Sequence, residues 1–282
     1  MRLGYLILLL SLLPPAMASG APSLKDVGAI PHLSERGRAD YREFLGSGMH
    51  RAFAIGPGGS WAWRAERGSA QEALDAAVNA CQEGGEHSCE PYAIDAKVVF
   101  DSAAWFHLWG PYATRAEALG RPVGTRRGER FPDLAFHSPE GKAMKVSDLR
   151  GNVLVLHFWG SWCPPCMREM PDLQKLHDML KGASDIRFLL LPVREPFVKS
   201  RAWLEQKKIR MPAFDLGVKD ESDDKLSLSD GSRIPDRRVA AKFPTTYVLD
   251  KHGIVVFSHV GETHRWGEYV NFLRDARSRS GK

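Results

Sequence analysis

The chain has 282 residues, 43% hydrophobic and 26% charged, and 39 basic against 34 acidic side chains give a formal net charge of +5. This composition is ordinary for a globular protein, and the length allows one large domain or two modest ones. The basic residues are scattered apart from small clusters within residues 126–130 and 274–279, and no basic stripe is interleaved with aromatic residues, so the charge indicates a solvated surface rather than a nucleic-acid interface.

Residues 1–18 have the pattern of a secretory signal peptide. Arg2 supplies a positive charge, residues 6–13 are apolar, and Ala16-Met17-Ala18 places small residues before a cleavage site. The apolar run is too short for a comfortable membrane span, and no cysteine follows the cleavage site to carry a lipid anchor. We therefore expect a soluble mature protein in an oxidising space, most simply a bacterial periplasm. An uncleaved signal that anchors the chain in a membrane is the alternative.

The next two segments differ in pattern. Residues 19–35 lack hydrophobic periodicity and contain two prolines, so we expect an exposed leader. Residues 36–105 are expected to form a small α+β domain with a helix over residues 70–81, for which the Ser69 hydroxyl is a suitable N-cap acceptor. The strands of this domain are expected at residues 51–55, 61–63 and 92–100.

Two of the four cysteines belong to this small domain. An exported protein is expected to use its cysteines in pairs, and Cys81 ends the predicted helix while Cys89 precedes the next strand. A disulfide between them would close a short loop and stabilise a domain with a thin core by about 2.5 kcal/mol. A second, redox-exchanging pair is the alternative.

Residues 106–123 connect the small domain to the rest of the chain. This segment begins directly after Trp105 and contains Trp109 and Tyr112. The aromatic density favours a packed connector over a flexible tether, and an exposed aromatic ligand for a partner is the alternative.

Residues 124–280 alternate between strand and helix patterns. A polar insertion, residues 217–238, is expected either to fold over the site or to form a loop. The alternation predicts a thioredoxin-type α/β sandwich, preceded by the small disulfide-stapled α+β domain. The strands are expected at residues 133–136, 143–146, 153–156, 186–193, 212–215, 247–249 and 254–259, and the helices at 167–181, 196–207 and 266–277.

The motif Cys163-Pro164-Pro165-Cys166 lies where a buried strand is expected to turn into a helix. Residues 153–156 form a continuous apolar run, which is typical of a strand buried on both faces, and apolar residues recur at helical spacing from Met170 to Leu180. A zinc site needs four ligands, and the chain has no second C-x-x-C. The placement favours a redox-active dithiol over a metal site or inert thiols.

Three ordered motifs resemble those of the TlpA/ResA family of membrane-associated or periplasmic thioredoxin-like proteins. The resemblance covers about residues 124–280 and implies a thiol-disulfide oxidoreductase that works in the reductive direction, with no cofactor and no metal. Its partners would be exported cysteine-containing substrates, such as an apocytochrome c or a metal-site assembly protein, and a transmembrane thiol carrier that donates electrons. The motifs are FPDL (131–134) with SDLRG (147–151), FWGSWCPPC (158–166) with Glu169 and Pro171, and FPTTYVLD (243–250).

The two thiols are expected to have different roles. Cys163 is the more exposed thiol at the helix N-terminus, which stabilises its thiolate, so it should attack a substrate disulfide. Cys166, one turn into the helix, should then resolve the mixed disulfide. The two prolines remove amides that would stabilise the Cys163 thiolate, which favours a reductant over a strong oxidant.

Two further side chains are candidates for proton transfer. The resemblance places Glu169 near the thiols, where burial would raise its pKa and let it accept the Cys166 proton; a solvated glutamate is the alternative. His157 stands where thioredoxins have a buried Asp and TlpA-like proteins often an Asn. It is either a neutral core imidazole satisfied by a hydrogen bond or a proton relay with a pKa near the working pH.

The resemblance also identifies Pro244 as a cis-proline that would turn the Phe243 backbone toward the dithiol for pairing with a substrate strand. Phe243 replaces the small or β-branched residue usual at this position. With Trp162 it would form an aromatic lip that restricts the substrate. Two other functions are open: a Cu(I)-binding assembly chaperone that uses both thiols, which lacks a clear third ligand, and a peroxidase, which lacks the expected threonine before Cys163.

Overall fold

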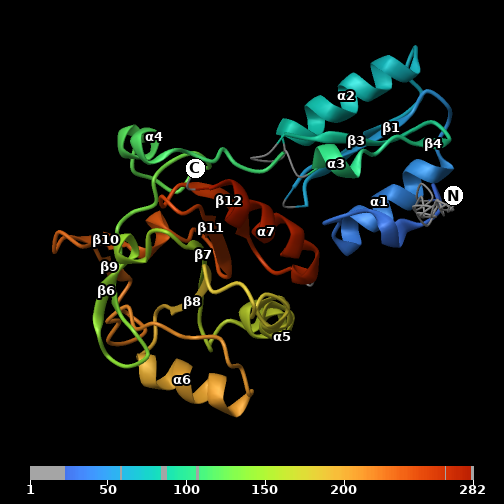
Figure 1. The fold of residues 1–282 in the computed structure, drawn as a ribbon. Helices are drawn as coiled ribbons and strands as arrows, with labels where there is room; N and C mark the ends of the chain where they lie inside the picture. Colours follow the sequence, from blue (N-terminus) through green and yellow to red (C-terminus); the bar gives the residue numbers. More distant parts are fainter. Residues whose placement is uncertain (1–22, 58, 84–87, 106–107, 264, 281–282) are drawn as a thin grey trace, which may run out of the picture.

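The computed structural model describes residues 23–57, 59–83, 88–105, 108–263 and 265–280. The predicted signal peptide, residues 1–18, and the start of the predicted leader lie outside these ranges. The described chain forms a smaller N-terminal part and a larger C-terminal part, and helix α7 (Val270–Arg279) lies on the side of the larger part that faces the smaller one (Figure 1). No helix within the described ranges combines the length and apolar character needed to cross a lipid bilayer.

An antiparallel sheet packed between two helices forms the N-terminal part. The sheet order is β2-β1-β3-β4, and strand β1 is buried at every residue. Phe53 and Ile55 pack into a cluster with the first helix, whereas Ala52 and Ala54 on the opposite face pack against the second. The elements are α1 (Glu35–Gly46), which the sequence analysis does not predict, β1 (Ala52–Ile55), β2 (Trp61–Arg64), α2 (Ala70–Glu83), β3 (Glu90–Ile94) and β4 (Lys97–Val98).

Two expectations for this part are wrong. Residues 92–100 form a β3–β4 hairpin rather than one strand, because Asp95 adopts a left-handed backbone (φ 49°) and the chain turns there. The leader is not exposed at Ile30 and Leu33, which are buried in the same cluster as α1. It lacks periodicity because it forms a short 3₁₀ turn, η1 (Val27–Ala29), and not because it is solvated.

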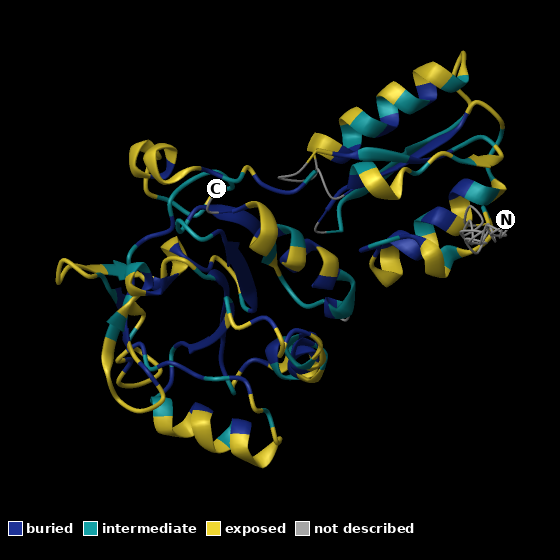
Figure 2. Ribbon diagram, in the orientation of Figure 1, coloured by how far each residue is buried: buried dark blue, intermediate teal, exposed yellow. Residues whose placement is uncertain are grey.

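A second four-stranded sheet, in the order β12-β11-β7-β8, forms the core of the larger part. Strands β7 and β8 are parallel, and β11 is antiparallel to both of its neighbours. Every residue of β7 is buried (Figure 2), and Val155 and Trp159 share a cluster with helices α5 (Pro164–Met179) and α7. His157, which lies between them, therefore also faces α5. The strands are β7 (Val153–Trp159), β8 (Ile186–Pro192), β11 (Thr245–Leu249) and β12 (Val255–Val260).

This sheet and its flanking helices form the predicted thioredoxin-like α/β sandwich. Parallel β7 and β8 are connected through α5, and α6 (Phe197–Gln206) follows β8. The predicted strand over residues 212–215 is reduced to isolated bridges that Ala213 makes with Leu190 and Asp215 with His137. A hairpin of β5 (Ala135–His137) and β6 (Ala143–Lys145) precedes β7.

The polar insertion, residues 217–238, is folded rather than a plain loop. It forms the hairpin β9 (Lys225–Ser227) and β10 (Arg233–Pro235), and Leu226 is buried in the cluster on the β5 side of the sheet. At its end, the buried Asp236 accepts two hydrogen bonds from the Arg194 guanidinium, at 2.6 and 3.0 Å. These hydrogen bonds thus hold the end of the insertion against the residues that follow β8.

The connector is packed against α7, in agreement with its aromatic density. The Trp109 ring is buried and stacks on Phe272 with 4.0 Å between ring centroids. The Tyr112 hydroxyl donates to Asp275 at 3.1 Å. Helix α4 (Arg115–Gly120) follows and leads into the larger part.

The structure confirms the disulfide between Cys81 and Cys89, and both side chains are buried. We predict that the double variant Cys81→Ala, Cys89→Ala loses about 2.5 kcal/mol of unfolding free energy, because the unfolded loop is no longer constrained. Urea unfolding of both proteins measures this loss. Disulfide-exchange activity should be unchanged, and a well-folded variant that loses activity would make this pair part of the redox chemistry.

Candidate redox site

The second disulfide lies at the junction of β7 and α5. The strand ends at Trp159, and Cys163 occupies the N-cap position of the helix. Cys163 and Cys166 are bonded to each other, and the Cys166 amide donates to the Cys163 sulfur at 3.3 Å. Because Pro164 and Pro165 have no N–H, the Cys166 amide is the first helical donor after the cap. One amide and the helix dipole therefore stabilise a thiolate at Cys163.

Both cysteines are covered. Cys163 is 4% exposed and Cys166 is fully buried, so Cys163 is the more exposed thiol, as expected, although little of its surface reaches solvent. The Trp162 and Phe243 rings meet edge to face, with 5.6 Å between ring centroids. Phe243 also packs against the hydrophobic cluster that contains Cys163. The Phe243 ring thus lies in the surroundings of Cys163, and Trp162 lies beside it with 38% of its surface exposed.

Glu169 is a carboxyl group with no exposed surface, one turn beyond Cys166. Its Oε2 accepts a hydrogen bond from the Thr263 amide at 2.8 Å, and its Oε1 lies 3.4 Å from His157 Nε2. Burial raises the pKa of Glu169 to about 8, although the Thr263 hydrogen bond lowers it. The solvated alternative is excluded, and the side chain is protonated at neutral pH.

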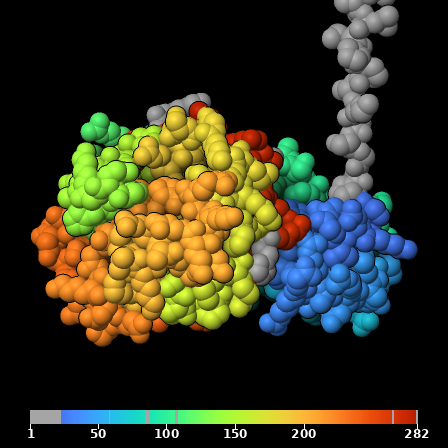
Figure 3. All heavy atoms as spheres, turned by 90° about the horizontal axis from the view of Figure 1, so that it is seen from below, coloured from blue at the N-terminus to red at the C-terminus, as the bar shows by residue number. Residues whose placement is uncertain are grey.

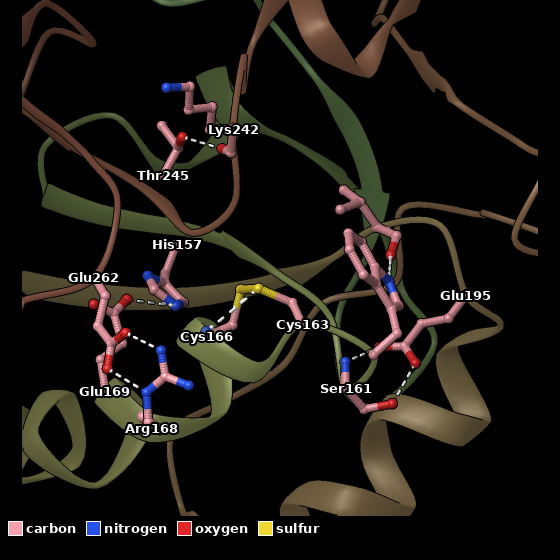
Figure 4. The surroundings of a disulfide bond; sticks show 12 residues. His157, Ser161, Cys163, Cys166, Arg168, Glu169, Glu195, Lys242, Thr245 and Glu262 are labelled. Atoms are coloured by element: carbon pink, nitrogen blue, oxygen red, sulfur yellow. Dashed lines mark hydrogen bonds and ion pairs between the residues drawn. A yellow bond between two sulfur atoms is a disulfide. The ribbon is translucent and has the colours of Figure 1, made fainter.

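His157 is the neutral partner of this acid. Its Nδ1 lies 2.9 Å from the Thr246 hydroxyl, and burial lowers its pKa to about 3. The hypothesis that His157 titrates near the working pH is therefore wrong. The contact of 3.4 Å with Glu169 joins two groups that are neutral at pH 7, so it is not an ion pair. Within the described residues, neither His157 Nε2 nor Glu169 Oε1 has a hydrogen-bond partner. Figure 4 shows both side chains on the Cys166 side of the disulfide.

The segment before β11 carries the cis-proline motif. The Phe243–Pro244 peptide bond is cis, as the motif predicts. The Thr245 hydroxyl donates to the Lys242 carbonyl at 2.6 Å, which ties the two ends of this turn together (Figure 4). The Arg237 guanidinium lies over the Phe243 ring, 4.9 Å from its centroid. The turn and the aromatic pair thus frame one side of the disulfide.

Sequence reasoning missed the buried Glu195, which positions the turn before Cys163. Its carboxylate accepts hydrogen bonds from the Ser161 amide at 2.6 Å and hydroxyl at 2.5 Å, and from the Ser200 hydroxyl at 2.7 Å. The Trp162 indole N–H donates to the Val193 carbonyl at 3.0 Å. The signal was available: Glu195 directly follows a buried strand parallel to β7, and the carboxyl ends of parallel strands meet at one edge of a sheet.

The arrangement offers thiol chemistry and one titrating carboxyl group. Within the ranges that the structure describes, no group of three or more His, Cys, Asp or Glu side chains is placed to hold a metal ion. Cys163 and Cys166 are bonded to each other in the structure, so a Cu(I)-binding function would first require their reduction to free thiols. A disulfide at the N-terminus of a helix is the arrangement on which thiol-disulfide exchange depends.

Comparison with known proteins places this site in a family. The redoxin family model matches residues 126–272, which include every residue of the site from His157 to Thr263. The thioredoxin-like protein YneN of Bacillus subtilis is 29% identical over 153 residues, 54% of this chain and 81% of that protein. The thiol-disulfide oxidoreductase ResA of Geobacillus thermodenitrificans is 30% identical over 144 residues, 51% of this chain and 75% of that protein.

Part of the chain is also similar to solved structures. A thioredoxin-family thiol:disulfide interchange protein from Chlorobium tepidum aligns with a TM-score of 0.39 and 20% identity, covering 54% of this chain and 97% of that one. The family model spans more than half of the chain, and ResA of Geobacillus thermodenitrificans is matched over three quarters of its own length. The chain therefore belongs to the redoxin family and is a protein-disulfide oxidoreductase of the ResA type.

Proposed function

We propose that the protein reduces disulfides of exported proteins in the bacterial periplasm through Cys163 and Cys166. The observation that carries the proposal is a disulfide at a helix N-terminus one turn from the fully buried Glu169. Two features of the chain support an oxidising compartment: the signal-peptide pattern of residues 1–18 and the second disulfide, Cys81–Cys89.

The reaction begins with the reduced dithiol. The Cys163 thiolate attacks one sulfur of the substrate disulfide, forming a mixed disulfide and releasing the other substrate sulfur as a thiolate. Cys166 then loses its proton to the Glu169 carboxylate and attacks the Cys163 sulfur. The Cys163–Cys166 disulfide forms, and the substrate leaves with both of its sulfurs reduced, so two electrons pass from the protein to the substrate.

Burial makes Glu169 suited to the second step. Cys166 is fully buried, so water has little access to its thiol and a nearby base is needed. A carboxylate of ordinary pKa would be too weak a base for a thiol, whereas burial raises the pKa of Glu169 to about 8, close to that of a free thiol. The His157 imidazole next to it stays neutral, so it adds no positive charge that would stabilise the ionised carboxylate.

The two prolines favour the reductive direction. They leave Cys163 with the Cys166 amide as its first helical donor, so its thiolate is only modestly stabilised. A dithiol whose reduced form is weakly stabilised gives up its electrons readily. The substrate class we propose is an apocytochrome c or a metal-site assembly protein with a cysteine pair, and the electron donor is a transmembrane thiol carrier that reduces the Cys163–Cys166 disulfide again.

Cys166→Ser should accumulate mixed disulfides between Cys163 and exported cysteine proteins, because the resolving thiol is absent. Non-reducing electrophoresis and mass spectrometry of the captured adducts measure this. Cys163→Ser is the matched control and should capture none. Capture by Cys163→Ser with none by Cys166→Ser would reverse the assigned roles.

Glu169→Gln should slow the reduction of a peptide disulfide by about 100-fold at pH 8, the size typical of a lost general base. The wild-type rate should rise as Glu169 ionises around pH 8, and the variant should lack this rise. Stopped-flow rates between pH 6 and 9.5 measure both. The exposed Glu205→Gln on α6 is the control and should keep the wild-type profile.

Stability gives a readout of Glu169 that is independent of activity. Folding raises its pKa from 4.5 to about 8, so the folded state holds a proton that the unfolded chain releases above pH 4.5. The wild type should therefore lose unfolding free energy as the pH rises from about 4.5 to about 8, and Glu169→Gln should not show that loss. Equal pH dependence in both proteins, together with an unchanged rate profile, would show that Glu169 is not the buried base.

The aromatic pair predicts substrate selection. Phe243→Thr should raise the rate with a branched disulfide peptide relative to a compact one, because it removes a bulky ring that packs against the cluster containing Cys163. Phe243→Tyr keeps the ring and should keep the wild-type ratio. A ratio of the two rates that Phe243→Thr leaves unchanged would show that the rings do not select the substrate.

A further inference from the structure

The chain between β12 and α7, described over residues 261–263 and 265–269, contacts the active-site helix α5 on one side. The Thr263 amide donates to Glu169 Oε2 at 2.8 Å, and the Trp266 amide donates to the Asp172 carboxylate of α5 at 2.7 Å. Glu262 accepts two hydrogen bonds from Arg168, the residue before Glu169, at 2.9 and 2.5 Å. The position of this segment therefore decides whether the Thr263 amide reaches the buried carboxyl group.

The same segment contacts the N-terminal part on its other side. The Glu268 carboxylate accepts a hydrogen bond from the His32 amide at 2.5 Å, and the His32 ring stacks on Tyr269 with 4.1 Å between ring centroids. The Arg265 guanidinium lies 3.4 Å from backbone carbonyl oxygens of the N-terminal segment, and it forms an ion pair with Glu268. Those carbonyls belong to Gly28, Ile30 and Leu33. Figure 3 shows atoms of this N-terminal part (blue) directly beside atoms of the C-terminal end of the chain (red).

Residues 28–33 are themselves firmly held. Ile30 and Leu33 are buried in the N-terminal cluster, and His32 is 7% exposed. Side chains of α1 bind the chain just before them: Arg38 donates to the Val27 carbonyl at 2.6 Å, and Tyr41 donates to the Leu24 carbonyl at 2.8 Å. Residues 28–33 are thus fixed to the N-terminal part and are not a loose tail. It lies outside the part of the chain that the redoxin family model matches.

We propose that residues 28–33 are a positioning element of the redox site: through Arg265 and Glu268 they hold the segment whose Thr263 amide binds Glu169, and so they set how readily Glu169 takes the Cys166 proton. The proposal rests on the proposed function and gives the N-terminal part a role in it. Arg265, Glu268 and His32 are positioning residues, because none of them touches the disulfide.

Loss of the contacts made by residues 28–33 should raise the pKa of Glu169, for a reason that lies in the surroundings of its carboxyl group. Burial raises its pKa, and the Thr263 hydrogen bond opposes that rise because an N–H donor stabilises the ionised carboxylate. When residues 28–33 no longer hold the segment, this bond weakens and Glu169 ionises only at higher pH. The other titratable or polar groups that face Glu169 come from β7, β12, α5, the segment itself and η5 (Trp266–Tyr269): they are His157 with His259 beyond it, Asp172, Glu262 and the Trp266 indole.

The test measures the pH profile of disulfide exchange in two variants of the full chain. Arg265→Met removes the guanidinium from the three carbonyls, and His32→Ala removes the ring that stacks on Tyr269. Each should move the midpoint of the rising limb upward, by about 1 pH unit for Arg265→Met, the size expected for weakening one hydrogen bond to a charged group. Amide hydrogen exchange at Thr263 should become faster in both. Arg274→Met, the same substitution at an exposed position on α7, is the control and should change neither quantity.

The outcomes separate this proposal from the proposed function. Folded Arg265→Met and His32→Ala proteins that keep the wild-type midpoint and the wild-type Thr263 exchange rate would overturn the positioning role, while the Glu169→Gln result stands on its own. If Arg265→Met does not fold, the His32→Ala midpoint and its Thr263 exchange rate decide. A wild-type profile that does not depend on Glu169 would instead contradict the proton transfer in the proposed function.

Discussion

A carboxyl group with no exposed surface lies at the centre of the chemistry proposed for this site. Glu169 lies one turn beyond the disulfide, with the Thr263 amide on one oxygen and the His157 imidazole near the other. Desolvation disfavours its charge, and the single amide donor only partly restores it, so its pKa is raised to about 8. The group is therefore an acid at rest and becomes a base at a pH where thiols also ionise.

The fold builds this environment from two sides. Alternation along β7 places His157 on the face that α5 covers, and α5 carries Cys166 and Glu169 inward at i and i+3. From the opposite direction, the chain between β12 and α7 supplies the Thr263 amide and is held in turn by the N-terminal part. The buried Glu195 fixes the turn before Cys163. An ordinary thioredoxin-like sandwich thus gains an extra support at its proton acceptor.

Much of the fold and part of the site can be predicted from the sequence, for physical reasons that differ from one element to the next. The strand and helix around Cys163 follow from continuous apolarity and helical spacing, which are local patterns, and the pairing of Cys81 with Cys89 follows from counting cysteines. The burial of Glu169 was expected only from its motif. The Thr263 contact joins residues 94 positions apart, and no local pattern encodes it. Glu195 can be located only through the topology, because it follows a strand that lies parallel to β7. The pattern of the leader wrongly predicts exposure, because Ile30 and Leu33 are buried in a turn, where periodicity carries no signal.

The central claim is that Glu169 is an acid at neutral pH inside the folded, oxidised protein. A ¹³C NMR titration of the glutamate side-chain carboxyl groups, with Glu169 assigned by its loss in Glu169→Gln, tests this directly. The account predicts one carboxyl resonance that titrates near pH 8, well above the others, and that disappears in the variant. A Glu169 resonance that titrates near 4.5, the ordinary value for a glutamate, would contradict it.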